Sequence, residues 1–497
     1  MSKFKVLLVY PNLQMVALMP SNIAILSARL KKAGVDVRLF DTTLYKTAEK
    51  SVDDIRVEHM QLRPFNLKEK DVHYKNSDVF EDFERTVGEY MPDLIGVSAA
   101  DDTIDLGIAL VSRVRERRIH ITVGGVYPTF SPNEIIHNEN VDSICIGEGE
   151  EALVELCIKM QNGEDITDIK NLWVKGNGKI YKNSIRSLVD IDILPYEDFD
   201  IFEEKRFYRP MQGKIYRMIP VTIDRGCPYG CSFCAAPLQR KLYMDSGRGG
   251  YFRVKTTVRV MDELKYHIDR YNANYIYFNS ETFFAREEKD IEEFAKKYAS
   301  DICLPFWCQT RIETITERRI KLLEGMNCDR ISIGLEHGNE EFRKKVLNKH
   351  FTNRHVMEAF KILEKSRIPV TVNNIIGFPD ETRDLAFDTI RLNRSIKADS
   401  INAYFFVPYR GTSLRHHCIE KGYIHADAKT DSLMRRSILN MPQFHPNEIE
   451  GLVRTFPLYV KMPESHFDKI RIAEQLNEEG DRALSELREI FFKEYFR

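Results

Sequence analysis

The sequence predicts an α/β protein in which two runs of alternating strands and helices are followed by a helical tail. Three observations favour this class. Short apolar segments alternate with amphipathic ones over residues 6–160, the alternation returns over residues 219–407, and apolar residues recur with helical spacing in the remaining tail. A chain of 497 residues is also too long for one ordinary domain and suggests two or three.

The first run implies a parallel sheet, because strands and helices alternate along it, and such open sheets bind ligands at the carboxyl ends of their strands. A β-hairpin is expected over Leu172–Tyr181, with Gly176-Asn177-Gly178 at its turn. Residues 42–92 are charged and weakly periodic, and either a substrate-access cap or a solvated helical decoration fits them. The expected strands are Val6–Tyr10, Val37–Asp41, Leu94–Ser98, Ile119–Val123 and Ser143–Ile146, and the expected helices are Asn22–Ala33, Ile104–Arg115 and Glu150–Met160.

The second run begins near Met218 and again alternates strands with helices. Its tail ends in Ile470–Arg497, where apolar and charged residues repeat as in a packed amphipathic helix. The expected strands are Ile219–Asp224, Tyr275–Asn279, Pro305–Thr310, Arg330–Leu335, Val370–Ile376 and Ile401–Val407, and the expected helices are Val258–Tyr271, Glu287–Tyr298, Thr316–Met326, Asn353–Ser366 and Arg383–Ile396.

A proline-punctuated acidic segment, Asp190–Asp198, separates the two runs and predicts a linker. We therefore place the first domain at residues 1–185, the linker at 186–215, the second domain at 216–415 and a helical C-terminal extension at 416–497.

Three cysteines, Cys227, Cys231 and Cys234, form a CxxxCxxC triplet directly after the first strand of the second run. A structural zinc site or an inert cluster uses four protein ligands. Three thiolates would instead hold three irons of a [4Fe–4S] cube and leave the fourth iron open to an outside ligand. The intervening glycines and proline supply the tight turns that let the sulfurs converge. Unligated cysteines in a turn, or a zinc site completed by a distant histidine, are the alternatives.

With Phe233 directly before the last cysteine, the triplet resembles that of the radical S-adenosylmethionine (SAM) superfamily. Two earlier segments, Val123–Thr129 and Gly147–Glu150, resemble the cobalamin-binding domain that precedes the barrel in one large subclass. The resemblance implies a Rossmann-like, flavodoxin-like cobalamin-binding domain followed by a partial (β/α)6 TIM-type barrel, and it implies a [4Fe–4S] cluster, SAM and cobalamin as cofactors. The later segments that resemble the superfamily's barrel motifs are Asn279–Phe284, Trp307–Arg311, Ile333–Gly338, Ile376–Thr382 and Pro408–Thr412.

The resemblance also implies which residues would hold SAM. The polar segment Asn279-Ser280-Glu281-Thr282 would meet the amino group, although the same residues could serve only as a helix N-cap. Arg311 could pair with a carboxylate and Glu336 could accept from ribose hydroxyls, or both could form surface salt bridges. Phe233 and Gly377 would border the adenine, although a turn alone would explain the glycine.

Four loops of the first domain would receive cobalamin by the same resemblance, with glycines that let the backbone approach the ligand closely. Each loop alone could be plain loop chemistry. In the methyltransferase and mutase type of cobalamin domain, the histidine of an Asp-x-His-x-x-Gly motif after the first strand coordinates cobalt. That motif does not follow the first strand here, so the lower face of cobalamin should lack a histidine ligand. His73, which lies in another loop, is expected to be a surface residue. The expected cobalamin-binding residues are Tyr10, Pro11, Leu13, Ser98, Ala99, Gly124, Gly125, Val126, Tyr127, Gly147, Glu148 and Gly149.

The implied reaction is reductive cleavage of SAM at the cluster to a 5′-deoxyadenosyl radical, followed by methylation of an unactivated carbon of a small-molecule or natural-product substrate through methylcobalamin. An external electron donor such as flavodoxin or ferredoxin would be required. Three other functions stay open: a non-methylating cyclisation, ring contraction or oxidation, a radical enzyme whose first domain has lost cobalamin, and a non-catalytic cobalamin or redox sensor. A methylthiotransferase acting on transfer RNA is disfavoured, because the sequence has neither a second cysteine triplet nor a basic terminal domain.

Composition disfavours nucleic acid as a partner without excluding a polynucleotide substrate. Lys and Arg number 73 against 75 for Asp and Glu, so there is no net basic field to recruit nucleic acid. No apolar stretch approaches the length of a membrane span, and the first apolar segment is too short for a signal peptide, so we expect a cytoplasmic protein. Nine cysteines in that compartment favour reduced thiols or metal ligands over disulfides.

Overall fold

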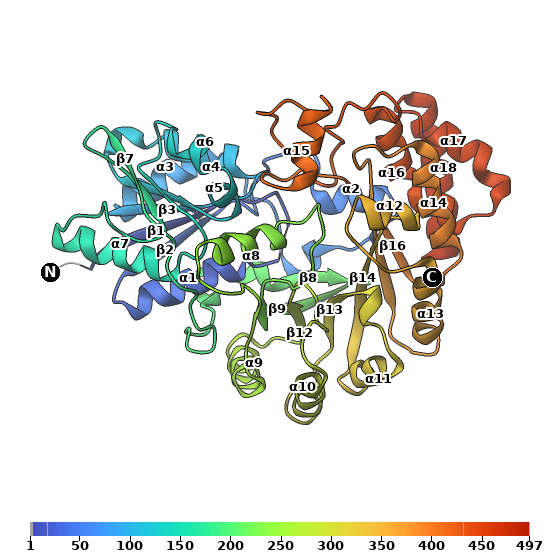
Figure 1. The fold of residues 1–497 in the computed structure, drawn as a ribbon, viewed down its shortest axis with the longest axis horizontal. Helices are drawn as coiled ribbons and strands as arrows, with labels where there is room; N and C mark the ends of the chain where they lie inside the picture. Colours follow the sequence, from blue (N-terminus) through green and yellow to red (C-terminus); the bar gives the residue numbers. More distant parts are fainter. Residues whose placement is uncertain (1–2, 17, 431, 497) are drawn as a thin grey trace. The chain divides into compact units, whose positions relative to one another are not determined.

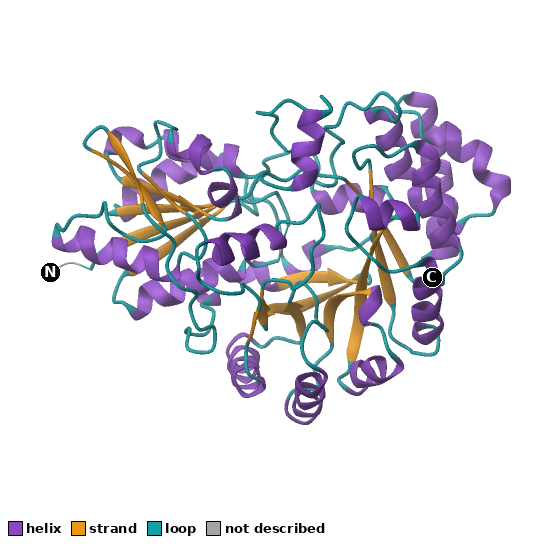
Figure 2. Ribbon diagram, viewed as in Figure 1, coloured by secondary structure: helices purple, strands orange, loops and turns teal. Residues whose placement is uncertain are grey.

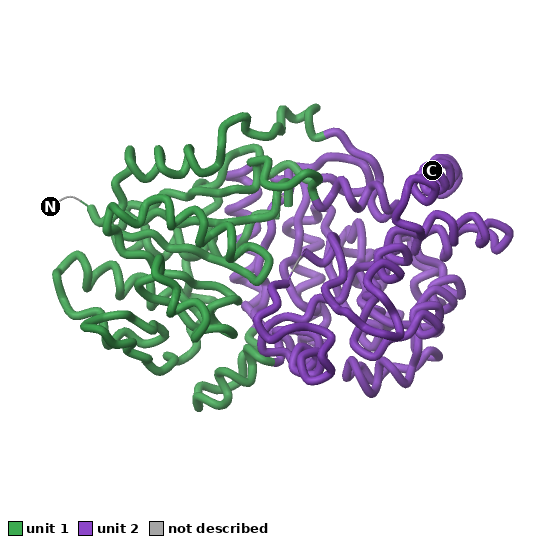
Figure 3. The backbone as a smooth tube through the Cα atoms, turned by 90° about the horizontal axis from the view of Figure 1, so that it is seen from above, with its two compact units in different colours: residues 1–51, 67–209, 238–253 green, residues 52–66, 210–237, 254–497 purple. Residues whose placement is uncertain are grey.

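The computed structural model describes residues 3–16, 18–430 and 432–496. The chain forms two compact units, and each unit is assembled from separate stretches of the sequence (Figure 3). Within the described residues, no helix is both long enough and apolar enough to cross a bilayer. Unit 1 consists of residues 1–51, 67–209 and 238–253, and unit 2 consists of residues 52–66, 210–237 and 254–497.

Unit 1 contains a seven-stranded sheet in the order β2-β1-β3-β4-β5-β6-β7 (Figure 1). Strands β1 to β5 are parallel, which confirms the predicted Rossmann-like sheet, and β6 and β7 extend it with antiparallel pairs. The strands are β1 (Lys5–Tyr10), β2 (Asp36–Asp41), β3 (Leu94–Ser98), β4 (His120–Gly124), β5 (Ser143–Cys145), β6 (Leu172–Gly176) and β7 (Lys179–Lys182). The helices between them are α1 (Ser21–Lys32), α3 (Val79–Tyr90), α4 (Ile104–Ser112), α5 (Val126–Phe130), α6 (Pro132–Ile136) and α7 (Glu150–Asn162).

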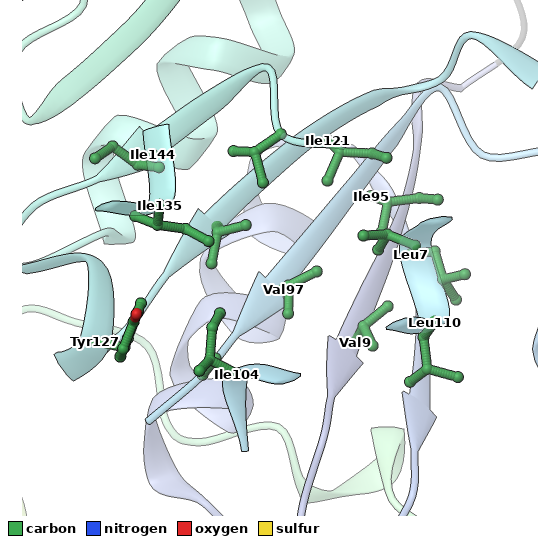
Figure 4. Packing of buried hydrophobic residues seen from close by; sticks show 14 of the residues in the cluster. Leu7, Val9, Ile95, Val97, Ile104, Leu110, Ile121, Tyr127, Ile135 and Ile144 are labelled. Carbon is green, nitrogen blue, oxygen red and sulfur yellow. The ribbon is translucent and has the colours of Figure 1, made fainter. Parts of the chain in front are cut away.

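The core of unit 1 explains why these strands form. Parallel strands are covered by helices on both faces and therefore consist of nearly continuous apolar residues. Figure 4 shows side chains of β1 and β3, among them Val9 and Val97, packed beside Ile104 and Leu110 of α4, and all four are buried. Burial of each such side chain contributes about 1.5–3 kcal/mol. The packed sheet is a rigid base for the loops at its carboxyl edge.

The predicted hairpin is also confirmed. Asn177 and Gly178 connect β6 to β7, and both have positive φ, +48° and +71°. Two successive left-handed residues form the turn type that matches the twist of antiparallel strands, and asparagine followed by glycine adopts it most readily.

Unit 2 contains a second seven-stranded sheet in the order β16-β15-β14-β13-β12-β9-β8. Strands β9, β12, β13, β14, β15 and β16 pair in parallel, and helices α9, α10 and α11 cover the outer face of the curved sheet (Figure 2). The predicted partial barrel is confirmed. Its strands are β8 (Tyr208–Met211), β9 (Lys214–Thr222), β12 (Tyr275–Asn279), β13 (Phe306–Arg311), β14 (Cys328–Glu336), β15 (Val370–Ile376) and β16 (Ser400–Phe405). Its helices are α9 (Thr257–Tyr271), α10 (Glu288–Asp301), α11 (Glu317–Gly325), α12 (Glu340–Lys345), α13 (Asn353–Leu363) and α14 (Arg383–Arg394).

Side-chain alternation decides which residues face the inside of the barrel. Phe278 of β12 packs against Phe294 and Tyr298 of α10, so it faces outward. Its neighbours Tyr277 and Asn279 must then face inward, because successive strand residues point to opposite faces. The Tyr277 ring lies 4.4 Å, centroid to centroid, from the Trp307 ring of β13.

The insertion at 42–92, which the sequence left unassigned, divides between the units. Residues 52–66, with helix α2 (Val52–Glu58), belong to unit 2. There the Gln61 side-chain amide donates to the Ala403 carbonyl at 3.0 Å and accepts from the Ala403 N–H at 3.2 Å. Ala403 lies on β16, an edge strand whose free backbone groups would otherwise be unpaired. The insertion therefore pairs the backbone groups of Ala403 at one edge of the open barrel.

The C-terminal helices follow as α15 (Ser413–Glu420), α16 (Pro446–Lys461), α17 (Phe467–Ala473) and α18 (Glu478–Tyr495). The prediction of a single helix over Ile470–Arg497 is wrong, because the helix is interrupted between the end of α17 and the start of α18. The Asn477 side chain caps α18 by accepting from the Gly480 N–H at 2.9 Å. Arg454 of α16 donates to the Ala473 and Gln475 carbonyls, which satisfies the last backbone groups of α17.

Candidate functional site

The three cysteines lie in the loop between β10 (Asp224–Arg225) and α8 (Ala236–Asp245) of the structure. Gly226 enters this loop with φ +87°, a conformation that favours glycine. The segment after α12 holds the loop backbone: the Ser232 N–H donates to the Leu347 carbonyl at 3.2 Å, and Asn348 Nδ2 donates to the Gly230 carbonyl at 2.7 Å. The cysteine loop is thus fixed to the barrel by backbone contacts that leave the sulfurs to other partners.

Each sulfur has a polar neighbour. Arg311 Nη1 donates to Cys231 Sγ at 3.0 Å, the Ala236 N–H donates to Cys234 Sγ at 3.4 Å, and Cys227 Sγ lies 3.8 Å from Thr282 Oγ1. N–H groups directed at cysteine sulfur stabilise thiolate ligands and tune the potential of iron–sulfur clusters.

The three cysteine thiols hinder one another's deprotonation. Burial raises the pKa of the Cys234 thiol to about 12, and the negative charges of Glu281, Cys231 and Cys227 act in the same direction. Burial also raises the pKa of Cys227. Three neighbouring thiolates therefore need positive charge to form, and metal ions supply it, since a coordinating thiol loses its proton outright. The donor set fits an iron–sulfur cluster held by Cys227, Cys231 and Cys234.

Arg311 ends β13 and is held on three sides. Besides Cys231, its guanidinium donates to Glu313 Oε1 at 2.6 Å and lies 3.9 Å from the ring centroid of Tyr229 in the cysteine loop. The sequence predicts that Arg311 pairs with a carboxylate of SAM. In the structure its guanidinium contacts both the Cys231 sulfur and the Glu313 carboxylate, and its pairing with SAM stays a prediction.

The polar segment after β12 lies next to the same loop. Asn279 Nδ2 is 3.5 Å from Thr222 Oγ1, and the Ser280 hydroxyl donates to Asp224 at 2.7 Å. Burial raises the pKa of Asp224 to about 6. Because it donates to Asp224, the Ser280 hydroxyl already has a hydrogen-bond partner within the protein. The Glu281 side chain is accessible to solvent, yet the surrounding protein raises its pKa by desolvation, and it is the acidic group of this segment that faces outward.

Glu336 is the last residue of β14 and Gly377 directly follows β15, and both have left-handed conformations, with φ +68° and +87°. Glu336 is an uncommon non-glycine case, and such backbone strain clusters at functional sites. Its carboxylate accepts from the buried Lys349 Nζ at 3.1 Å. The Gly377 N–H donates to Glu381 Oε2 at 2.6 Å, and Glu381 Oε1 lies 3.0 Å from His337 Nε2.

Sequence reasoning missed Lys349, Glu381 and His337 as parts of this site. His337 lies in the segment Ile333–Gly338 and Glu381 in the segment Ile376–Thr382. Both segments were recognised in the sequence, so a contact between their polar side chains could have been predicted. Lys349 has no such signal, because only the fold brings it to Glu336. The structure also places Phe378, the residue after Gly377, against Phe233, and their rings pack edge to face with centroids 5.9 Å apart.

In unit 1, the loops after β3, β4 and β5 meet at the carboxyl edge of the sheet. The Thr129 hydroxyl donates to the Gly125 carbonyl at 2.7 Å and accepts from the Gly147 N–H at 3.1 Å. A Cβ at Gly125 would lie 2.5 Å from the Ala99 carbonyl oxygen, and φ there is +106°. At Gly125 the backbone of one loop packs directly on the backbone of the other, so no side chain fits there. We call this close approach of Gly125 and Ala99, together with the Gly147 turn that Thr129 joins to it, the bare-backbone cradle.

The remaining residues expected at cobalamin lie along the same edge. Pro11, which lies between Tyr10 and Leu13 in the sequence, packs against Gly107 of α4. A Cβ added at Gly107 would lie 3.2 Å from the Pro11 side chain. Asn22 Nδ2 donates to the Ser98 hydroxyl at 2.8 Å, and the Tyr127 N–H donates to the Ala99 carbonyl at 3.3 Å. His73, outside these loops, lies 3.2 Å from Asp71 on the surface. The others of the expected set are Gly124 at the end of β4, Val126 in α5, and Glu148 and Gly149 before α7.

Comparison with known proteins gives both halves of the chain a family. The B12 binding domain model matches residues 17–157 and the radical SAM superfamily model matches residues 221–392, which together exceed half of the chain. An uncharacterized methyltransferase of Pyrococcus horikoshii is 25% identical over 345 residues, covering 68% of this chain and 72% of that protein. An anaerobic magnesium-protoporphyrin IX monomethyl ester cyclase of Rubrivivax gelatinosus is 24% identical over 67% of this chain and 60% of that protein, so the match spans less than two thirds of the cyclase.

A solved structure shares the fold over almost the whole length. TsrM from Kitasatospora setae, a radical S-adenosylmethionine methyltransferase solved with cobalamin and a [4Fe–4S] cluster bound, superposes with a TM-score of 0.66 and 14% identity. The superposition covers 98% of this chain and 100% of that one. The chain therefore joins a B12-binding domain to a radical SAM domain, and it belongs to the cobalamin-dependent radical SAM enzymes, whose cofactors are a [4Fe–4S] cluster, SAM and cobalamin.

Proposed function

We propose that this enzyme methylates an unactivated carbon of a small-molecule or natural-product substrate. When bound, the cluster and SAM supply reductive C–S bond cleavage and cobalamin supplies a methyl carrier. The observation that carries the proposal is the presence in one chain of a three-cysteine loop with N–H groups directed at two of its sulfurs and a bare-backbone cradle at the B12-type sheet edge. The methyltransferases among the similar proteins favour methyl transfer over other radical chemistry.

The residues divide the work as follows. Cys227, Cys231 and Cys234 would hold the cluster, and three protein ligands would leave it open to SAM. The carboxylate of Glu281 accepts from the SAM ammonium, because charge-assisted hydrogen bonds are the strong ones in such sites. Arg311 stabilises the cluster loop through Cys231, and a one-electron donor such as flavodoxin or ferredoxin supplies the electron.

A second candidate function is a non-methylating radical reaction on the same scaffold. The cyclase among the similar proteins favours it, since that relative matches two thirds of this chain.

One assay separates the two. Reconstituted protein would be incubated anaerobically with a strong reductant, hydroxocobalamin and SAM that carries a deuterated methyl group, and the products would be measured by mass spectrometry. Methyl transfer predicts S-adenosylhomocysteine and transfer of the labelled methyl group to the corrin. Formation of 5′-deoxyadenosine without any S-adenosylhomocysteine would overturn the methylation proposal in favour of the second candidate.

Replacing Glu281 with glutamine should weaken SAM binding about tenfold or more, because a hydrogen bond to a charged group is worth about 1.5–3 kcal/mol. Since desolvation by the surrounding protein raises the pKa of Glu281, wild-type affinity should also begin to fall on acidification at a higher pH than for an ordinary glutamate. Equilibrium dialysis with labelled SAM measures both effects. Glu287→Gln, at a side chain that is 73% exposed, is the matched control and should bind SAM as the wild type does. Equal affinities for the two variants would contradict the role of Glu281.

Replacing Arg311 with methionine should lower the midpoint potential of the cluster by about 60 mV, because an N–H donor favours the more negative, reduced state. A hydrogen bond to a charged group is worth about 1.5 kcal/mol, and 59 mV corresponds to about 1.4 kcal/mol for one electron. A redox titration followed by electron paramagnetic resonance (EPR) measures the potential. Arg330→Met is the control, since Arg330 bonds Thr371 near the start of β14. A potential unchanged in Arg311→Met, or lowered equally in the control, would argue against this role.

A further inference from the structure

The segment that follows the cysteine loop belongs to the other unit of the protein. Helix α8 begins at Ala236, two residues after Cys234, and the Ala236 N–H contacts the Cys234 sulfur. Residues 238–253 nevertheless belong to unit 1, whereas the cysteines and the chain from Val254 onward belong to unit 2. The chain therefore leaves the cysteine loop, packs into the B12-binding unit and returns to the barrel.

Tyr243 of α8 determines the shape of one of the B12-type loops. Its side chain is buried, and its hydroxyl accepts from the Glu148 N–H at 2.8 Å. A Cβ at Gly147 would lie 2.4 Å from the same hydroxyl, and Gly147 has φ +77°. The loop can approach the tyrosine only as bare backbone in a left-handed turn, so the two are fitted to one another.

Arg253 holds the same loop from the far end of the segment. Its guanidinium forms a two-pronged ion pair with the Glu148 carboxylate, with Nη1 3.3 Å from Oε2. Both side chains are largely buried, and Arg253 also donates to the Val189 carbonyl. Paired guanidinium and carboxylate groups fix orientation as well as distance. The backbone of Glu148 is thus held by Tyr243 and its side chain by Arg253.

The opposite side of this turn faces the remaining cobalamin loops. The Gly147 N–H donates to Thr129, which donates to the Gly125 carbonyl. One continuous set of contacts therefore runs from Tyr243 through Gly147 to the bare-backbone cradle at Gly125.

We infer that Tyr243 is a positioning residue for cobalamin, and that α8 makes cobalamin affinity depend on the state of the cysteine loop from which the helix starts. The inference rests on the proposed cobalamin site and adds to it a residue and a coupling. Without the hydroxyl, the Glu148 N–H loses its partner and the turn gains conformations that cobalamin must then suppress, which weakens binding. Because such coupling is reciprocal, assembling the cluster at the cysteines should tighten cobalamin binding through the same helix.

The test compares wild-type protein with Tyr243→Phe, each with a reconstituted cluster and after iron chelation, and titrates hydroxocobalamin by corrin absorbance. With the cluster present, the substitution should raise Kd about tenfold, within the usual range of coupling factors, and without the cluster the factor should fall to threefold or less. Tyr181→Phe, in the β6–β7 hairpin, is the matched control and should leave Kd unchanged. An unchanged Kd in Tyr243→Phe, or the same factor in both states, would overturn the inference.

Hydrogen exchange of the Glu148 amide, measured without cobalamin, separates failure of the inference from failure of the proposed function. We expect faster exchange in Tyr243→Phe than in the wild type. If the wild-type protein binds no cobalamin, the proposed function fails and the inference with it. If it binds cobalamin but the amide exchanges equally in both proteins, the inference alone is wrong.

Discussion

Replacing Cys227, Cys231 and Cys234 together with alanine should reduce bound iron and sulfide to background and lower 5′-deoxyadenosine formation by more than about 100-fold. Loss of an outer-shell partner alone costs a metal site up to about 100-fold, and these substitutions remove the ligands themselves. The fold should survive, because the loop backbone is held by Ser232 and Asn348 rather than by the sulfurs. Iron and sulfide assays and mass spectrometry of the reaction mixture measure the result.

The matched control removes three other thiols. Cys145, Cys303 and Cys418 lie outside the loop, and two of them are buried. Their combined replacement with alanine should leave iron content and SAM cleavage at wild-type levels, with some loss of stability from the buried positions. SAM cleavage that persists in the loop variant, or vanishes equally in the control, would contradict the assignment of the ligands.

Gly125→Ala should abolish cobalamin retention. The new Cβ would lie 2.5 Å from the Ala99 carbonyl oxygen, and φ +106° is a region that side chains rarely adopt. The loops after β3 and β4 would have to separate, and we expect the free energy of unfolding to fall by about 2–4 kcal/mol. Corrin absorbance after desalting measures retention, and thermal unfolding measures stability.

Gly34→Ala is the control that separates the effect of the steric clash at Gly125 from the effect of backbone strain alone. Gly34 also lies in unit 1 with φ +86°, but a Cβ there has no atom within 4 Å. We expect a loss of about 1–2 kcal/mol from the left-handed conformation and full retention of cobalamin. If Gly125→Ala retains cobalamin as well as Gly34→Ala does, the bare-backbone cradle is not where the corrin binds.

Local patterns account for what the sequence predicted correctly. Strands such as β1 and β3 are continuous apolar segments, and the cysteine triplet lies within eight consecutive residues, so both can be recognised without knowledge of distant contacts. The interruption between α17 and α18 was missed because it is stabilised by Arg454 of α16, which lies outside the segment whose pattern predicted the helix. The place of Gln61 at the edge of β16 depends on a contact between residues far apart in the sequence, and no periodicity reveals it.

The same limit applies to the site. The contact of Arg311 with the Cys231 sulfur depends on the fold and has no signal in the sequence, whereas its pairing with a SAM carboxylate stays a prediction. Helix α8 was not predicted at all, and the role of Tyr243 follows only from the fold, which brings it to Gly147 nearly a hundred residues earlier in the chain.

The central claim is that one iron of a three-cysteine cluster is open to SAM. Electron–nuclear double resonance on the reduced protein, mixed with SAM labelled with ¹⁵N at its amino group, measures that contact directly. A resolved ¹⁵N coupling that is lost in the three-cysteine variant is the predicted result. A reduced [4Fe–4S] signal that shows no ¹⁵N coupling at saturating SAM would contradict the account.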